Sequence, residues 1–118
     1  MKRILVVDDE PDICSNLSDI LSEFGYFVDT CTSPREAIRK AYEHPYDLAV
    51  LDLRMPGMDG VELFRELRKS HPGTEAILVT AYAEQQTAET ATREGIREIV
   101  PKPVDVPQLL HVLAQTRQ

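Results

Sequence analysis

Three aspartates, a threonine and a lysine follow short apolar runs of the sequence: Asp8, Asp9, Asp52, Thr80 and Lys102. A carboxylate can act as a nucleophile, a hydroxyl can donate a hydrogen bond, and an ammonium group supplies positive charge. Such groups suit phosphoryl transfer, whose loose transition state needs positioning and positive charge more than acid and base catalysis. Each residue alone is typical of a solvated loop, but the joint pattern indicates a site.

The three aspartates need a cation if they share one site. If the runs before Asp8 and Asp52 were neighbouring strands, the carboxylates would gather within about 5 Å. At an effective dielectric of about 20, each pair would then cost about 3 kcal/mol. Hard oxygen ligands, with room left for water and a phosphate, describe a magnesium site rather than a closed calcium cage or a zinc centre. We therefore expect bound Mg²⁺.

The elements that must position these residues can be read from the apolar pattern. Continuous apolar runs or alternation predict strands at 4–7, 26–31, 48–51, 76–79 and 99–100. Two residue pairs are typical helix-start signals, Ser33 with Glu36 and Asp59 with Glu62. Helices are expected at 13–24, from 34 towards 44, at 61–70, at 83–94 and after 105.

The alternation of strand and helix predicts an α/β fold. Five repeats of strand and helix favour right-handed crossovers and a doubly wound (βα)5 unit, with a parallel sheet covered by helices on both faces. Pro101 has no N–H to donate, so the fifth strand is expected at a sheet edge. Ligands of such sheets bind outside the carboxyl ends of the strands, where the five polar residues lie. We expect one domain over residues 1–118.

Composition excludes several classes of protein. With 20 acids against 13 bases the formal charge is −7, which disfavours direct nucleic acid binding. No apolar stretch approaches the roughly 20 residues that span a bilayer, so we expect a soluble, cytoplasmic protein without membrane contact. Cys14 and Cys31 lack metal-ligand spacing and are interpreted as reduced core residues. His44, His71 and His111 are interpreted as surface residues.

The polar motifs, with their spacing, resemble the receiver domain of two-component response regulators. The resemblance covers nearly the whole chain and is carried by residues 7–9, 52–60, 80–81 and 102–103. It implies a flavodoxin-like fold with the strand order 2-1-3-4-5. It also implies a phosphoprotein of phosphorelay signal transduction that catalyses only its own phosphotransfer and dephosphorylation, and that is otherwise no enzyme.

The resemblance also implies a role for each acid. Asp52 would accept a phosphoryl group from a phosphohistidine on a sensor histidine kinase or a phosphotransfer protein. Asp9, Asp52 and the backbone carbonyl of Arg54 would bind Mg²⁺ directly, and Asp8 would act through water.

Two further residues would contact the phosphoryl group. Thr80 would donate its hydroxyl to one phosphoryl oxygen, and Lys102 would bring its charge to another. The Lys102–Pro103 peptide bond is cis in this family. A downstream output domain or protein would receive the signal, and a homodimer through the last helix and strand is a further expectation.

The sequence departs from the family pattern in its second half. Ile99 stands where receivers usually carry an aromatic, and it offers no hydroxyl and a stiff χ1. Tyr82 is a candidate substitute for that aromatic. The expected helix at 83–94 contains no large apolar residue, so weak packing predicts that it is the mobile element.

Three other interpretations compete. A nucleotide or flavin carrier of this fold needs Gly, Ser or Thr after its first strand, whereas residues 8–11 read Asp-Asp-Glu-Pro. A haloacid-dehalogenase-like phosphatase would place a second aspartate where Arg54 stands. A degenerate receiver that binds proteins without phosphorylation is the remaining alternative, and the complete set of acids, threonine and lysine disfavours it.

Overall fold

The described part of the chain folds into a five-stranded sheet with five helices. The computed structural model describes residues 2–81 and 85–115. The strands are β1 Arg3–Val7, β2 Phe27–Cys31, β3 Leu48–Asp52, β4 Glu75–Thr80 and β5 Glu98–Pro101. The helices are α1 Pro11–Glu23, α2 Pro34–Glu43, α3 Gly60–Ser70, α4 Gln85–Arg93 and α5 Val106–Ala114. None of these helices is long and apolar enough to cross a membrane.

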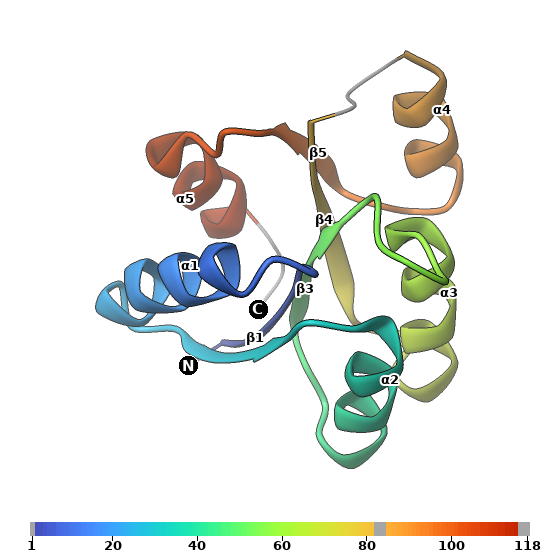
Figure 1. Ribbon diagram of the computed structural model, residues 1–118, viewed down its shortest axis with the longest axis horizontal. Coiled ribbons are helices and arrows are strands. Elements are labelled where there is room, and N and C mark those ends of the chain that lie inside the picture. The colour runs from blue at the N-terminus through green and yellow to red at the C-terminus, as the bar shows by residue number, and fades with distance from the viewer. Residues whose placement is uncertain (1, 82–84, 116–118) are drawn as a thin grey trace.

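All neighbouring strands pair in parallel, in the order β2-β1-β3-β4-β5. Helices α1 and α5 cover one face of the sheet, and α2, α3 and α4 cover the other (Figure 1). The expected fold class and strand order are therefore confirmed. Because β1 lies between β2 and β3, the strand order reverses beside it, and the carboxyl ends of β1 and β3 are neighbours.

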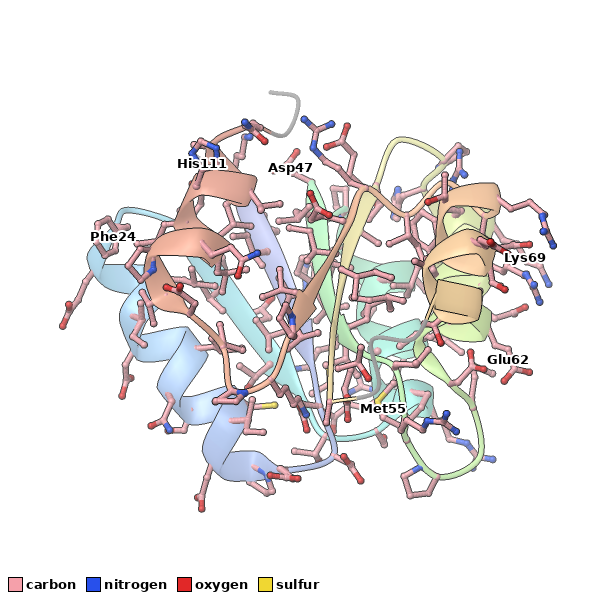
Figure 2. All side chains as sticks on the ribbon, turned by 90° about the horizontal axis from the view of Figure 1, so that it is seen from above. Phe24, Asp47, Met55, Glu62, Lys69 and His111 are labelled. Atoms are coloured by element: carbon pink, nitrogen blue, oxygen red, sulfur yellow. The ribbon has the colours of Figure 1, made fainter. Side chains whose placement is uncertain are left out.

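Two apolar cores hold the sheet between its helices. On the face covered by α2, α3 and α4, the largest fully buried side chain is Phe64, which packs with Leu51 and Leu78. On the opposite face, Val50 and Ile77 pack with the buried residues of α1 and α5. Figure 2 shows side chains filling the space on both sides of the sheet. Consecutive residues of a strand thus point their side chains into opposite cores. This alternation fixes the face of the sheet toward which the side chain at each strand end points.

The helix starts follow the expected signals. The Ser33 hydroxyl accepts a hydrogen bond from the Glu36 N–H at 3.3 Å, as an N-cap of α2. At α3, Asp59 and Glu62 form a capping box in which each side chain accepts from the other's backbone N–H. Asp105 caps α5 in the same way as Ser33 caps α2.

The described part of helix α4 packs through small side chains, and an ion pair holds the residue that follows it. Its described residues are polar or small, and Ala91 is the buried one that joins the core. Glu94, just past the helix, accepts a hydrogen bond from Arg65 Nε of α3 at 2.6 Å. Gly95, at φ +90°, then turns the chain into β5. Tyr82 lies outside the described residues, so its role as a substitute aromatic stays a prediction.

Gly60 allows the start of α3 to approach the acidic edge of the sheet. Its N–H donates to the Leu53 carbonyl at 2.9 Å. A Cβ at this position would lie 2.6 Å from the backbone oxygen of Asp52 and 2.9 Å from Leu78 Cδ2. Both distances are shorter than van der Waals contact, so only glycine fits here without a shift of the backbone.

We therefore expect Gly60→Ala to lower the free energy of unfolding by about 1–3 kcal/mol, the usual cost of overpacking. Gly73→Ala is the matched control, because a Cβ there meets nothing within 4 Å, and it should change stability by less than about 0.5 kcal/mol. Urea denaturation of both variants measures the difference. Equal stabilities for the two variants would contradict the close approach at Gly60.

Candidate functional site

Four strands deliver polar residues to the carboxyl edge of the sheet. Asp8 directly follows β1, Asp52 ends β3, Thr80 ends β4, and Lys102 directly follows β5. Asp9 joins them from the loop after β1, and one carboxylate oxygen each from Asp8, Asp9 and Asp52 lies within 4.8 Å of the others. The expected gathering of three carboxylates at this edge is therefore what the structure shows.

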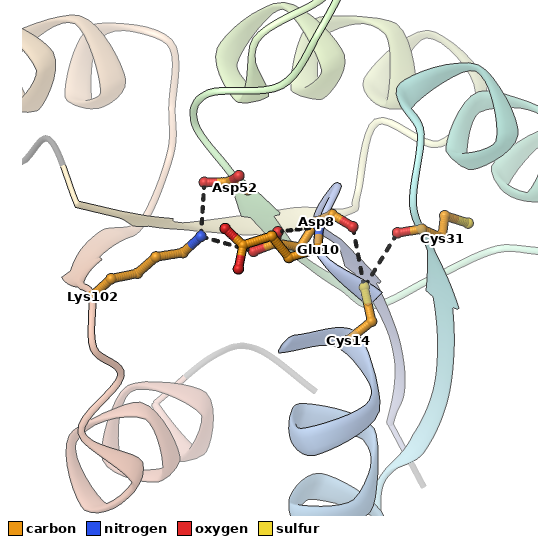
Figure 3. Close-up of polar contacts among 6 residues, drawn as sticks. All are labelled: Asp8, Glu10, Cys14, Cys31, Asp52 and Lys102. Atoms are coloured by element: carbon orange, nitrogen blue, oxygen red, sulfur yellow. Dashed lines mark hydrogen bonds and ion pairs between the residues drawn. The ribbon is translucent and has the colours of Figure 1, made fainter. Parts of the chain in front are cut away.

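Asp8 is buried, and each of its polar groups is held. Its Oδ1 accepts a hydrogen bond from the Glu10 N–H at 2.9 Å, and its Oδ2 accepts one from Lys102 Nζ at 2.9 Å (Figure 3). Its own N–H donates to the carbonyl of Cys31 at 3.2 Å. The carboxylate is therefore fixed in orientation before any ligand binds.

Lys102 is the cation of the site. Its Nζ lies 2.9 Å from Asp8 Oδ2 and 3.3 Å from Asp52 Oδ1, as the dashed lines of Figure 3 show. Its backbone N–H donates to the Thr80 carbonyl at 2.9 Å, and the following peptide bond to Pro103 is cis. Burial alone would lower the pKa of Lys102, but the carboxylates of Asp8 and Asp52 outweigh burial and raise it. The ammonium group therefore stays charged at neutral pH.

Asp52 is buried and electrostatically disfavoured as an anion. Its exposed fraction is 6%. Burial is the main cause that raises the pKa of Asp52, the charge of Asp8 adds to it, and Lys102 opposes it. A positive charge brought to the site would stabilise the carboxylate form of Asp52.

The remaining predicted residues lie around this centre. Thr80 is fully buried at the end of β4, the strand that pairs with β3. Asp9 is exposed, and Arg54 is exposed two residues beyond Asp52 in the loop before α3. The roles of the Thr80 hydroxyl and of the Arg54 carbonyl stay predictions.

The carboxylate cluster fits a hard divalent cation. Three aspartates carry three negative charges, and Lys102 neutralises one of them, so the edge keeps an excess of negative charge. The ligand atoms are all oxygens, and exposed Asp9 leaves one side open to water, as Mg²⁺ prefers. Among the acids, histidines and cysteines of the described residues, these three aspartates form the group whose ligand atoms lie close enough together to hold a metal ion.

The sequence did not reveal two features that shape this edge. Cys14 was interpreted as a core residue; it is a buried free thiol, but its Sγ also contacts the Asp8 carbonyl. Gly60 was only one residue of the motif at 52–60. The structure shows that a glycine is needed there because the start of α3 lies close to the backbone of Asp52. Both depend on distances between segments, for which the sequence offers no pattern.

Ile99 lies away from the carboxylates. It is half-buried on β5 and packs against the core beneath α2, α3 and α4. It also lines a pocket of about 260 Å³ between α4 and β5, together with Ala88 and Ala91 of the helix. The position of the usual aromatic is thus filled by an aliphatic side chain under a helix of small residues.

Comparison with known proteins agrees with this geometry. The model of the response regulator receiver domain matches residues 4–114. A response regulator receiver protein of Anaeromyxobacter sp. (strain Fw109-5) is 41% identical over 93% of this chain and 46% of its own length. Transcriptional regulatory protein GlrR of Escherichia coli (strain K12) is 39% identical over 87% of this chain and 23% of its own length. The chain thus spans half or less of these relatives.

Solved structures show the same fold. Response regulator protein TrrA of Thermotoga maritima in complex with Mg²⁺–BeF is 38% identical, with a TM-score of 0.86 over 98% of both chains. TrrA in complex with histidine kinase ThkA gives a TM-score of 0.85 at 38% identity, over 98% of this chain and 97% of that one. By its sequence, its fold and the acids at its carboxyl edge, the chain belongs to the family of response regulator receiver domains.

Proposed function

We propose that residues 1–118 form one receiver domain in which Asp52 accepts a phosphoryl group from a phosphohistidine. The observation that carries this proposal is the convergence of Asp8, Asp9, Asp52 and Lys102 at one edge of the sheet. The carboxylate of the buried Asp52 lies there 3.3 Å from the Lys102 ammonium group. A relative 38% identical has been solved with a histidine kinase, which supports a sensor kinase as the donor.

The chemistry assigns one task to each residue. A carboxylate oxygen of Asp52 attacks the phosphorus, the P–N bond of the phosphohistidine breaks, and the imidazole leaves with the bonding electron pair. Mg²⁺, held by Asp9, Asp52 and the Arg54 carbonyl with Asp8 acting through water, would supply charge to the phosphoryl oxygens. Lys102 and the Thr80 hydroxyl would each bind one phosphoryl oxygen, so the chain acts by positioning and charge.

The same residues limit the reactions that we propose for this domain. The residue that the chain would change is its own Asp52, first by phosphorylation and later by hydrolysis. We therefore propose a signalling protein that catalyses only these two steps, acts in the cytoplasm, and binds neither nucleic acid nor membrane by this domain. Its output would pass to a downstream domain or protein, and a homodimer through α5 and β5 is part of this proposal.

The donor would dock on a groove beside Lys102. This groove, of about 550 Å³, lies between α1 and the segment that leads into α5. Its apolar walls include Ile13, Leu17 and Ile20 of α1 and Val106 of α5, and Lys102 lies in its lining. A helix that carries a phosphohistidine could bury apolar side chains there while the imidazole reaches the acidic edge.

Labelling by a small phosphodonor tests the proposal directly. After incubation with acetyl phosphate and Mg²⁺, we expect the wild-type chain to gain one phosphoryl mass and Asp52→Asn to gain none, as measured by intact mass spectrometry. If both chains gain the mass, the acceptor is another residue. If neither does, the chain is a binding module without phosphorylation.

The raised pKa of Asp52 predicts a pH dependence of stability without metal. The folded chain holds this proton more tightly than the unfolded chain, whose ordinary pKa is 3.8, so stability falls as pH rises from that value through the raised pKa. Asp52→Asn should remove this loss and be more stable than wild type at neutral pH without Mg²⁺. Urea denaturation across the pH range measures it.

Magnesium should reverse that order. At a Mg²⁺ concentration hundredfold above the dissociation constant of the wild-type chain, wild type should gain about 2.7 kcal/mol in its free energy of unfolding. Asp52→Asn, which lacks one ligand charge, should gain clearly less. Equal stabilisation of both chains by Mg²⁺ would place the metal elsewhere.

The docking groove is tested by comparing two phosphodonors: a kinase, which must dock on the groove, and acetyl phosphate, which need not. Ile20→Glu puts a charge into the apolar wall, and it should slow transfer from a phosphorylated kinase at least about tenfold, the cost of a central interface residue. Labelling by acetyl phosphate should persist. Tyr42→Glu on α2 is the control, because Tyr42 is 80% exposed on the opposite face. A similar slowing in both variants would refute docking on this groove.

A further inference from the structure

A buried thiol lies directly beneath the acidic edge. Cys14, in the first turns of α1, is 3% exposed. Its Sγ lies 3.3 Å from the carbonyl oxygen of Asp8 and 3.4 Å from the carbonyl oxygen of Cys31 (Figure 3). These two carbonyls stand at neighbouring strand ends, just past β1 and at the end of β2.

The thiol is a donor in this place. Cys14 is a buried free cysteine whose sulfur faces two carbonyl oxygens, which are acceptors and can be paired with the sulfur only by an S–H donor. A protonated thiol has one hydrogen to donate, and here it lies within reach of two carbonyl oxygens. Neither oxygen has a hydrogen to offer, so the thiol is the donor, and its one hydrogen is shared between the two carbonyls or given to one of them at a time.

These contacts complete the fixation of Asp8. Its N–H donates to the Cys31 carbonyl at 3.2 Å, its carbonyl accepts from the Cys14 thiol, and its carboxylate accepts from Glu10 and Lys102. Cys14 therefore contacts the carbonyl side of Asp8 directly, and it also contacts the Cys31 carbonyl that accepts from the amide side of Asp8. This matters because the carboxylates of Asp8, Asp9 and Asp52 repel one another and would otherwise push the loop outward.

Cys31 does not share this position. Its side chain belongs to the core beneath α2 and α3, whereas Cys14 belongs to the core beneath α1 and α5. The two thiols thus lie on opposite faces of the sheet, and Figure 3 shows the Cys31 side chain directed away from Cys14. A disulfide role is therefore excluded, and Cys31 serves as a matched buried thiol that lies in the opposite core.

We propose that Cys14 is a positioning residue of the metal site, whose thiol holds the main chain of Asp8 so that the carboxylates of Asp8 and Asp9 face Asp52. The proposal rests on the Mg²⁺-dependent function proposed above. It assigns to Cys14 no contact with the metal or with the phosphoryl group. Its effect reaches the site through the backbone of the loop after β1.

Two measurements on the full chain test this role, one with metal and one without. Cys14→Ala should weaken Mg²⁺ binding about two- to fivefold, the range expected for one S–H···O contact, as measured by calorimetry. In the metal-free chain, the Glu10 amide donates a hydrogen bond to the Asp8 carboxylate, and its hydrogen exchange should accelerate by a similar factor. Cys14→Ser, which keeps a donor at nearly the same volume, should restore at least half of each loss.

Cys31→Ala is the control, because it removes the same atom from the opposite face. It should leave both Mg²⁺ affinity and Glu10 exchange as in wild type. Unchanged values in Cys14→Ala, equal losses in Cys31→Ala, or no recovery in Cys14→Ser would each overturn the positioning role. If the wild-type chain bound no Mg²⁺, the proposed metal site would fail, and Glu10 exchange would still decide the role of Cys14.

Discussion

Repulsion among three carboxylates at one edge of the sheet is the constraint on which the rest of this structure depends. Asp8, Asp9 and Asp52 bring their oxygens within 4.8 Å of one another, and Lys102 offsets only part of their charge. Left alone, such a cluster would spread, because each carboxylate is stabilised by moving into water. The fold prevents this by holding the acids at the ends of rigid strands, and a bound cation would relieve the repulsion that remains.

The two apolar cores supply that rigidity. Because both faces of the sheet are covered, β1, β3 and β4 are buried along nearly their whole length, and their ends cannot move independently. The edge itself is held by polar contacts, in which the backbone of Asp8 and the capped start of α3 take part. The described side chains of helix α4 include no large apolar residue, so the molecule combines a stiff acidic edge with a lightly packed flank.

The sequence predicted the fold and the gathering of the acids because both follow from periodic patterns. Apolar runs of strand length, each followed by a polar residue, put Asp8, Asp52, Thr80 and Lys102 at one edge once the strands are parallel. The contacts of Cys14 and the space around Gly60 escaped prediction, because they depend on distances between segments that no local pattern encodes. The Arg65–Glu94 ion pair escaped for the same reason: its partners belong to different helices.

The contact between Lys102 and Asp8 also bears on the order in which the molecule can mature. It joins residues 94 positions apart, while Lys102 depends on β5 being in place beside β4. During synthesis, Lys102 is made after β1 and β3, so the acids at the ends of these strands cannot meet this counter-charge until the C-terminal part of the sheet has docked. Docking of β5 beside β4 therefore couples completion of the sheet to partial neutralisation of its acidic edge.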